Sequence, residues 1–441
     1  MSAYLKYIAF CHKIFILYKH ILLTFFYQGG LYMLEKKKLL IGAAGVALAT
    51  AYAVPADAKV TLMADEPSGW SFSVDGNVNA FVVYSSGTAD ANIGTAHAAQ
   101  RSSAGDNTRI QTGLLPSKFG FGVQGPASNG VQLRGYFGLY PQIQNSATKT
   151  ARGAQIDMRE MYAAASGDFG EILFGRTLSL FQRNAIVQDM TLFGVGATNN
   201  NVTNGGTTLG RIGFGYVYPD FNANVRYTTP SYNGTTVSIG LFDPSQIRST
   251  TGMAATEFVA NEANFPRLEG ELNISLDNLS KGSNLVFSGV YQEAENASEI
   301  EAHGIHVGGT LAAGPAALTA HYYNGECLGI TLQLDTGGVS SDGICRDADG
   351  FYVQGTYSYG AGKVGISWGG SYQDQAGTDA SNAFDEKDAQ EMFTVGLYHN
   401  LAPEWLAVAE YSQTNEEWYD TDAGDDDAES SIFSVGMFYL W

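Results

Sequence analysis

Alternation of apolar and other side chains is the clearest pattern in this chain, and the last twelve residues, SSIFSVGMFYLW, show it best. Phe433, Val435, Met437, Tyr439 and Trp441 share one parity. A strand of this kind can turn an aromatic-tipped apolar face to lipid and a small or polar face to water, as strands of transmembrane β-barrels do. The segment alone also fits the last strand of a soluble β-sandwich.

Short strand-like runs separated by turn signals extend over the chain from residue 70 onward. We expect eight strands in one direction, at about 70–84, 130–144, 170–180, 234–243, 283–293, 316–325, 362–373 and 404–416. Eight partners in the other direction are expected at about 109–124, 154–166, 222–230, 266–277, 301–313, 350–360, 390–400 and 430–441. The pattern therefore predicts sixteen antiparallel strands.

The connections between these strands alternate strictly between short and long. The short ones read GPASNG, SGDFG, TPSYNG, DNLSKGS, AAGP, YGAGK and LAPE. The long ones span 85–108, 145–153, 181–221, 244–265, 294–300, 326–349, 374–389 and 417–429. Tight turns at one end and larger external loops at the other are typical of an outer-membrane barrel.

Several predicted strands also show two distinct faces. Within 266–277, four aliphatic residues alternate with Glu269, Glu271 and other polar residues, so one face suits lipid and the other a wet lumen. The alternation is less regular between 154 and 180. There, Met158, Glu160 and Tyr162 face outward if Arg159 faces the lumen, which a contact between subunits tolerates better than lipid does.

The amino-terminal part has the pattern of a leader. From Met33, three lysines precede an apolar stretch and the small-x-small sequence Ala56-Asp57-Ala58, which indicates a secretory signal peptide over 33–58. Residues 1–32 fit an over-extended start better than a domain, although a short membrane anchor is the alternative. Residues 59–441 are then a single barrel domain, since no domain boundary or fixed repeat interrupts them.

Charge and hydropathy narrow the class further. Removal of 1–58 leaves 383 residues with a net charge of −24, because the leader carries six lysines and two acids. This acidity argues against nucleic acid as a partner. No remaining stretch approaches the roughly 20 apolar residues of a membrane helix. A membrane-bound chain of this kind must be a closed barrel, since closure satisfies every backbone group in lipid.

Two cysteines remain after the leader, Cys327 and Cys345, eighteen positions apart in one long connection. In the oxidising compartment beyond the inner membrane, a disulfide is the favoured state of such a pair. A metal pair is the alternative, but no further Cys or nearby His offers more ligands.

Signals for other chemistry are weak. Gly120, Gly122 and Gly125 spell G-x-G-x-x-G but end a strand rather than open a helix. His303 and His306 are three apart, which in a strand places them on opposite faces. No G-x-S-x-G occurs, so we expect no enzyme, no metal centre and no cofactor. The acidic loops near 385–388 and 419–430 could still bind Ca²⁺ or Mg²⁺ or bridge lipopolysaccharide through them.

Three stretches carry a family resemblance. They contain Ser-Lys-Phe-Gly-Phe at 117–121, Arg-x-x-Tyr at 159–162 followed by Gly-Asp-Phe-Gly and Gly-Arg, and Arg-Tyr-x-x-Pro at 226–230. In this order the sequence resembles the trimeric porins of Gram-negative outer membranes. The final aromatic is similar to the assembly signal of that family, although Trp441 replaces the usual Phe.

The resemblance implies a third external loop, here 181–221, folded into the lumen with acids opposite a basic ladder on the wall. By motif, Lys118, Arg159, Arg176 and, on the strand after the loop, Arg211 take the basic positions, and Asp189 takes that of the loop acid. Arg134 is a further inward candidate by parity. The second loop acid is missing, because Thr191, Leu192 and Phe193 stand where Pro-Glu-Phe is usual.

We therefore expect a homotrimeric porin in the Gram-negative outer membrane, in contact with lipid and lipopolysaccharide and inserted by the barrel assembly machinery. Opposed charges across a narrow channel sort solutes by size and charge without a tight binding site. A substrate-selective channel and a structural or adhesin barrel are the alternatives. Phe433, Tyr439 and Trp441 should close the barrel, with Trp441 in the aromatic girdle beside Trp70.

Overall fold

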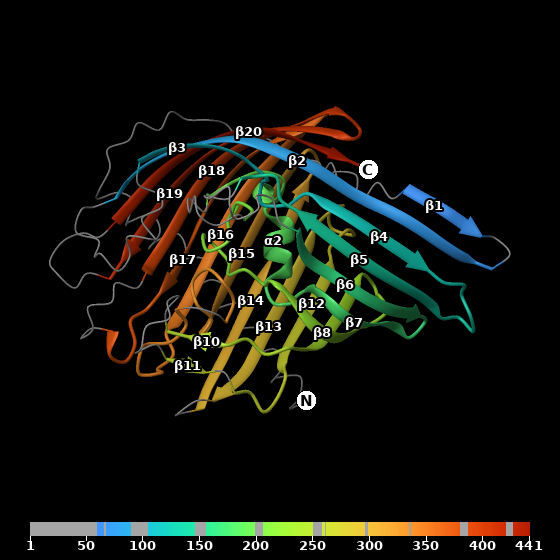
Figure 1. The fold of residues 1–441 in the computed structure, drawn as a ribbon, viewed down its shortest axis with the longest axis horizontal. Coiled ribbons are helices and arrows are strands. Elements are labelled where there is room, and N and C mark those ends of the chain that lie inside the picture. The colour runs from blue at the N-terminus through green and yellow to red at the C-terminus, as the bar shows by residue number, and fades with distance from the viewer. Residues whose placement is uncertain are drawn as a thin grey trace, which may run out of the picture. The chain divides into compact units, whose positions relative to one another are not determined.

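The computed structural model of the protein describes a β-barrel and the loops at its mouth (Figure 1). The described residues are 60–65, 68–89, 105–145, 156–198, 206–249, 258–260, 262–295, 299–334, 337–379, 387–419 and 427–441. The leader predicted over 1–32 and 33–58 lies outside them, and so do residues 385, 386 and 420–426 of the acidic loops.

In the described part of the chain, seventeen strands form the barrel wall, each antiparallel to its neighbours. They are β2 Trp70–Ala89, β3 Gly105–Gln111, β4 Lys118–Gln124, β5 Gln132–Pro141, β6 Ile156–Gly167, β7 Gly170–Leu178, β8 Phe221–Thr228, β9 Thr235–Phe242, β12 Arg267–Ser275, β13 Asn284–Glu295, β14 Glu299–Ala313, β15 Ala316–Glu326, β16 Asp347–Tyr359, β17 Gly362–Gln373, β18 Lys387–Ala402, β19 Trp405–Trp418 and β20 Asp427–Leu440. β3 and β4 occupy one position, since both pair with β2. The wall therefore has the sixteen positions that the sequence predicts.

The barrel closes where β20 pairs with β2, from Ala89–Ala428 to Asn77–Leu440. Trp441 adds two backbone hydrogen bonds with Gly76, at 2.9 and 3.0 Å. A Cβ at Gly76 would lie 2.7 Å from the Trp441 ring, so glycine at this position leaves room for the indole. The expected position of Trp441 beside Trp70 is wrong. Trp441 pairs with Gly76, six residues further along β2.

An additional strand takes the edge of β2 beyond the end of β20. β1, Val60–Asp65, pairs with β2 between Trp70 and Val74. In Figure 1 it lies at the end of the barrel that carries the short turns. We call this the short-turn end and the opposite one the long-loop end. The sequence pattern did not predict β1.

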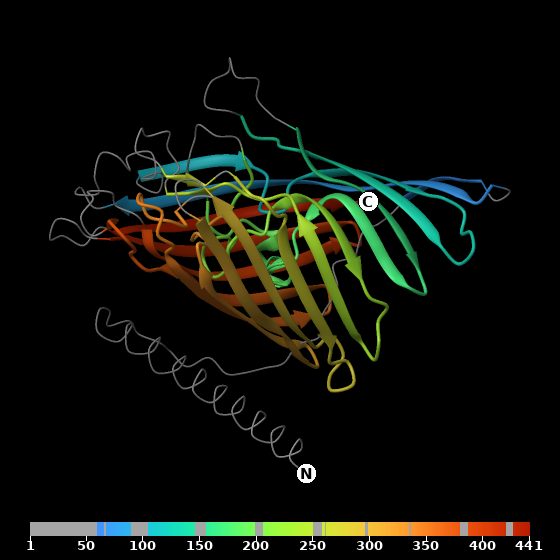
Figure 2. The same cartoon turned by 90° about the horizontal axis from the view of Figure 1, so that it is seen from below.

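The two faces of the wall follow the expected alternation, and the tilted strands are seen from another side in Figure 2. On β20, Phe433, Val435, Met437 and Tyr439 are exposed on the outside while Ser434 is buried inside. On β12, Leu268 is exposed and Glu269 and Glu271 are buried. Large apolar side chains are exposed on other strands too, among them Val82, Ile110, Leu133, Phe174, Val225, Ile239, Ile305, Leu318, Ile366 and Val395. The outside therefore suits lipid.

The strand predicted over 109–124 is interrupted. Residues 112–117 leave the wall between β3 and β4 and turn inward, and Leu114 is buried there. Asn79 of β2 holds this segment by accepting from the Gly113 N–H and donating to the Leu115 carbonyl, at 2.9 and 3.0 Å. A side-chain amide thus replaces ladder hydrogen bonds, which strand periodicity cannot foresee.

β6 contains a bulge that changes which side chains face inward. Gly138 of β5 pairs with Glu160 and Tyr140 pairs with Asp157, so two residues of β6 oppose Leu139. A bulge of this kind resets the alternation. Both Arg159 and Glu160 therefore reach the interior.

The outward positions expected for Glu160 and Tyr162 are accordingly wrong. Tyr162 stacks on Tyr136 of β5, with ring centroids 5.6 Å apart, and Met158 and Met161 are exposed on the outer face. The irregular alternation in this stretch has its cause in the bulge.

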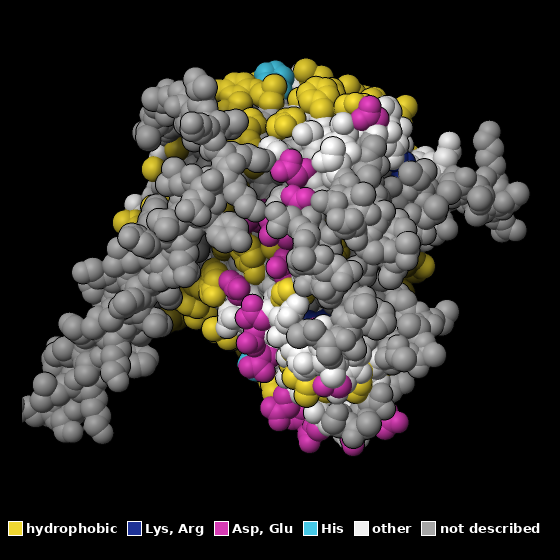
Figure 3. Space-filling model, turned by 90° about the vertical axis from the view of Figure 1, so that its left-hand side faces the viewer, with side chains coloured by type: hydrophobic (Ala, Val, Ile, Leu, Met, Phe, Trp, Pro, Cys, Tyr) yellow, Lys and Arg dark blue, Asp and Glu magenta, His cyan; other side chains and the backbone are white. Residues whose placement is uncertain are grey.

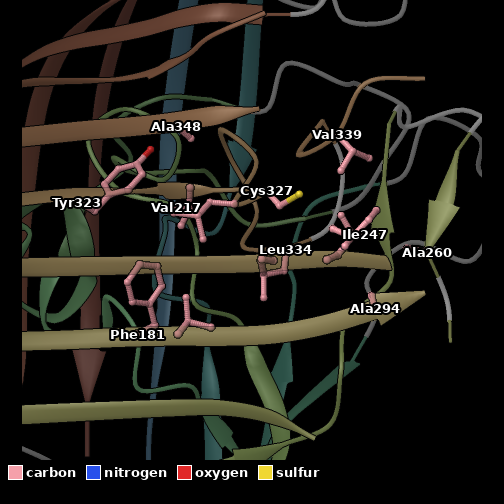
Figure 4. Close-up of a cluster of buried hydrophobic side chains, with 14 residues drawn as sticks. Phe181, Val217, Ile247, Ala260, Ala294, Tyr323, Cys327, Leu334, Val339 and Ala348 are labelled. Atoms are coloured by element: carbon pink, nitrogen blue, oxygen red, sulfur yellow. The ribbon is translucent and has the colours of Figure 1, made fainter. Parts of the chain in front are cut away.

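Loops from the long-loop end pack against one another and against the barrel wall (Figure 4). Phe181 and Val217 from the connection after β7, Leu334 and Val339 from the connection after β15, and Ile247 next to β9 form one apolar cluster with the wall. Cys327, which also lies in this cluster, is joined to Cys345 by a disulfide. Two short strands, β10 Ile247–Arg248 and β11 Val259–Ala260, pair at its edge.

Acidic side chains gather at the long-loop end, which faces the viewer in Figure 3, and basic ones are sparse there. In this region Arg346 forms a buried ion pair with Asp379, at 2.7 Å, that joins the connections on either side of β16 and β17. Hydrogen bonds from the Ser340 hydroxyl and from Thr378 hold the pKa of Asp342 below its usual value. The mouth is therefore built from linked loops.

Candidate functional site

The described residues of the connection between β7 and β8, 179–198 and 206–220, run into the barrel, and we call them the inward loop. It contains a short helix, α2 Arg183–Gln188, and a 3₁₀ turn, η2 Met190–Phe193. These elements are seen inside the barrel in Figure 1. The expected inward fold of the third long connection is thus what the structure has.

Carboxylates of β12 hold the start of the inward loop. Glu269, fully buried, accepts from the Leu180 and Phe181 N–H groups at 2.7 and 2.9 Å and lies 2.9 Å from Arg267. Glu271 pairs with Arg183 at 2.5 Å. Ionised acceptors make stronger hydrogen bonds than neutral ones, so this end is firmly fixed.

A third carboxylate, on another strand, holds the loop beyond η2. Glu410 of β19 accepts from the Val195 and Gly196 N–H groups at 2.6 and 3.0 Å, and from the Tyr398 hydroxyl at 2.5 Å. A Cβ at Gly194 would lie 1.9 Å from a Glu410 oxygen, so this approach requires glycine.

The middle of the inward loop is tied to further strands. Gln354 of β16 accepts from the Met190 N–H and donates to the Gln188 carbonyl, at 2.6 and 3.1 Å. From the broken wall segment, Leu114 N–H donates to the Gly194 carbonyl at 2.9 Å. The loop therefore crosses the lumen and is hydrogen-bonded to the wall on several sides.

The loop acid expected in the constriction, Asp189, is buried. Its carboxylate accepts from the Thr191 N–H and hydroxyl at 2.9 and 2.6 Å and from the Tyr216 hydroxyl at 3.1 Å. It caps η2 and does not line the cavity described below.

Arg211 is also buried, and it lies within the inward loop rather than on the strand after it, because β8 begins only at Phe221. Its guanidinium donates to the Phe214 and Met392 carbonyls, both at 3.0 Å. The motif positions therefore selected Asp189 and Arg211, two residues that stabilise the inward loop and do not line the cavity.

A cavity of about 590 Å³ lies between the inward loop, the broken wall segment and the inner faces of neighbouring strands. Lys118 of β4 lines it and lies 3.1 Å from Asp75 and 3.7 Å from Glu160. Tyr136 donates to Asp75 at 2.7 Å, and Tyr140 donates to Glu160. This part of the cavity carries opposed charges at close range.

Arg159 lines the same cavity from the bulge in β6. Its Nε lies 2.9 Å from Asp157, and Nη1 donates to the Tyr218 hydroxyl at 3.4 Å. The guanidinium also lies over the rings of Tyr140 and Phe221, at 5.8 Å from each centroid. Of the six predicted constriction residues, the structure brings Lys118 and Arg159 together at the cavity.

The other two predicted residues lie elsewhere. Arg134 points inward, as its parity predicts, but pairs with Glu171 at 2.6 Å outside the cavity lining. Arg176 is exposed and has the parity of the exposed residues Ile172 and Phe174. Its expected inward position is corrected to the outer face, because simple alternation from Phe174 places it there.

Several groups at this site are not among the residues predicted from the sequence. Asp75, Glu160 and Lys363 line the cavity, and Glu410 anchors the loop. The inward parity of Glu410 in β19 was readable from the strand, as it was for Glu269. Glu160 was hidden by the bulge, which no residue pattern marked.

Among the described residues, no group of three or more His, Cys, Asp and Glu is placed to hold a metal ion, and no helix is long and apolar enough to cross a membrane.

Comparison with known proteins agrees with this architecture. The family model described as Gram-negative porin matches residues 39–439. The outer membrane channel DcaP of Acinetobacter baumannii is 14% identical, with a TM-score of 0.61 over 86% of this chain and 99% of that one. The anion-selective porin from Comamonas acidovorans is 15% identical, with a TM-score of 0.56 over 84% of this chain and all of that one.

Salmonella typhi OmpF, in complex with daunomycin, is 12% identical, with a TM-score of 0.55 over 86% of this chain and all of that one. No curated protein sequence matches the chain significantly. These likenesses show the shared barrel fold, and the family model covers most of the sequence. The chain belongs to the Gram-negative porin family, and it is an outer-membrane channel for passive diffusion rather than an enzyme.

Proposed function

We propose that small hydrophilic solutes and ions pass the inward loop through the cavity lined by Lys118, Arg159, Asp75 and Glu160, and that these four charges form the filter. The observation that carries the proposal is the meeting of two cations and two carboxylates in one cavity beside the loop. Opposed charges in a narrow wet passage sort solutes by charge and size.

The burial of Asp189 and Arg211 supports this assignment by elimination. Each is bound by groups of the inward loop itself, so neither presents its charge to a passing ion. Lys118 and Glu160, by contrast, keep 18% and 23% of their side-chain surface exposed. The filter proposed here therefore lies on β2, β4 and β6 of the wall.

Ion selectivity tests the filter. The protein is reconstituted in planar bilayers, and reversal potentials are measured in a KCl gradient. Lys118→Gln should shift the reversal potential toward cation preference, because a lumen cation is lost. Lys387→Gln is the matched control, since Lys387 pairs with Glu416 and neither residue lines the cavity. Equal shifts in both variants, or no conductance in the native protein, would contradict the proposal.

We also propose that the channel is a homotrimer. Its support is the outer face of β6 and β7, where Ile156, Met161 and Phe174 are exposed beside the charged Arg176. An arginine facing lipid is costly, whereas one at a subunit contact finds polar partners. OmpT of Vibrio cholerae, whose fold is similar to that of this chain, has been solved in a trimer form.

Cross-linking in detergent and in native membranes tests the assembly. Arg176→Glu should reduce the trimer fraction, while Lys281→Glu, in a short turn, should leave it unchanged. A monomer in the native protein would end the trimer proposal.

Contacts with lipopolysaccharide and the assembly machinery, and Ca²⁺ or Mg²⁺ at the acidic loops, stay predictions.

A further inference from the structure

Lys363 is a cation of the lumen that differs from the others. It lies at the start of β17, lines the cavity and keeps part of its surface exposed. Its Nζ lies 4.9 Å from the centroid of the Tyr398 ring. Among the described residues it forms no ion pair, whereas Lys118 has two carboxylates within 3.7 Å.

The carboxylates near Lys363 already accept hydrogen bonds from other groups. Asp189 and Glu410 are the carboxylates whose charge acts on it, and each accepts three hydrogen bonds from neutral donors of the inward loop and Tyr398. Neither approaches Lys363 closely enough to form an ion pair. The ammonium therefore keeps its donors for a group that enters the cavity.

Apolar side chains make up most of the remaining lining. They come from the broken wall segment, the inward loop, the connection after β15 and strand ends, among them Leu115, Ile186, Val187, Phe193, Leu332 and Leu440. A passage for hydrated ions alone does not require such a surface. A concave apolar surface with a few placed charges is the usual character of a small-molecule site.

We propose that this cavity is a binding subsite for small amphipathic anions, solutes with one carboxylate and a short aliphatic or aromatic body, and that Lys363 is their anion-binding residue. The carboxylate contacts Lys363 and the body packs against the apolar lining, with Val187 its most exposed part on the loop. The inference rests on the proposed passage of solutes through this cavity and names their class.

Channel block in planar bilayers tests the subsite. The potassium chloride current is measured with acetate, butyrate or hexanoate added, and with hexanol as the uncharged probe. Each methylene buried in the lining should strengthen block by up to about fourfold. Hexanoate should therefore block at the lowest concentration, and hexanol should block weakly.

Four variants separate the contributions of the ammonium group and of the apolar lining. Lys363→Gln should weaken hexanoate block about tenfold, the equivalent of roughly 1.4 kcal/mol, and Lys363→Arg should retain it. Val187→Ser should reduce the difference between hexanoate and acetate. Arg134→Gln, which removes an inward cation outside the cavity lining, should leave block unchanged.

Equal block by acetate and hexanoate in the native protein would overturn the proposal, and so would unchanged block in Lys363→Gln. Equal loss in Arg134→Gln and Lys363→Gln would reduce the effect to general lumen charge and would also overturn it. Failure of the proposed filter has a different signature, since the reversal potential of Lys118→Gln would then equal that of Lys387→Gln, whatever the block by anions.

Discussion

The carboxylates inside this barrel fall into two groups that differ in what they bind. Glu269 and Glu410 are buried and accept from backbone N–H groups of the inward loop. Asp75 and Glu160 line the cavity and face Lys118 and tyrosine hydroxyls. The first group positions the loop, and the second provides charge to the passage.

The difference explains why charge alone does not identify a filter residue. Both groups are acids on inward positions of strands, so their sequence patterns are the same. A carboxylate that accepts several backbone hydrogen bonds has its charge compensated locally. A carboxylate beside a cation in an open cavity contributes to the field that a solute meets.

Glu269→Gln should have the largest effect on the anchoring group. It leaves Arg267 buried without its counter-charge and weakens two backbone hydrogen bonds, so the free energy of unfolding should fall by about 3–5 kcal/mol. Chemical unfolding followed by tryptophan fluorescence measures the loss. Glu171→Gln, which breaks the more exposed pair with Arg134, should cost under about 1 kcal/mol. Similar losses of unfolding free energy in Glu269→Gln and Glu171→Gln would contradict the special role of Glu269 in anchoring the loop.

Loss of the Cys327–Cys345 disulfide should come next. The bond closes an 18-residue separation in the connection that supplies Gln333, which donates to Glu269 at 2.9 Å. Loop-closure entropy predicts a loss of about 3 kcal/mol. The double Cys→Ser variant should also show larger current fluctuations, since this connection packs against the inward loop. Unchanged unfolding and steady current would show that the other contacts suffice.

Glu410→Gln should cost somewhat less, about 1.5–3 kcal/mol, because hydrogen bonds to a charged acceptor are replaced by neutral ones and no buried cation is orphaned. The inward loop should loosen beyond η2, and the mean single-channel conductance should change. A variant with native conductance and native stability would show that Gln354 and the wall segment hold this part of the loop without Glu410.

Asp189→Asn should have the smallest effect of these variants, a small change in ion selectivity. The family resemblance implies that Asp189 is the loop acid of the constriction, but the hydrogen bonds from Thr191 and Tyr216 shield this carboxylate. We expect a smaller shift than in Glu160→Gln, measured in the same KCl gradient. A larger shift for Asp189→Asn would return this residue to the filter.

Most of the fold could be predicted from the sequence, because period-two alternation and loop lengths are local signals. They predicted sixteen wall positions and the closing strand, whereas the inward fold of the third long connection was predicted only from the resemblance to the porin family. The break at 112–117 and the bulge in β6 were not predictable, since each depends on a contact across the barrel, from Asn79 and from the register of β5.

The site was harder to predict for the same reason. Motif correspondence selected Lys118 and Arg159 correctly as inward residues but could not distinguish an exposed charge from a buried one, as Asp189 and Arg211 show. Lys363 belongs to no motif, and its role follows only from which carboxylates are already bound.

The reversal potential of Glu160→Gln in a KCl gradient tests the central division most directly. Loss of a cavity carboxylate that anchors no backbone should shift the reversal potential toward anion preference, while the free energy of unfolding stays within about 1 kcal/mol of native. An unchanged reversal potential combined with a large loss of stability would contradict the account, because Glu160 would then be one of the anchoring acids.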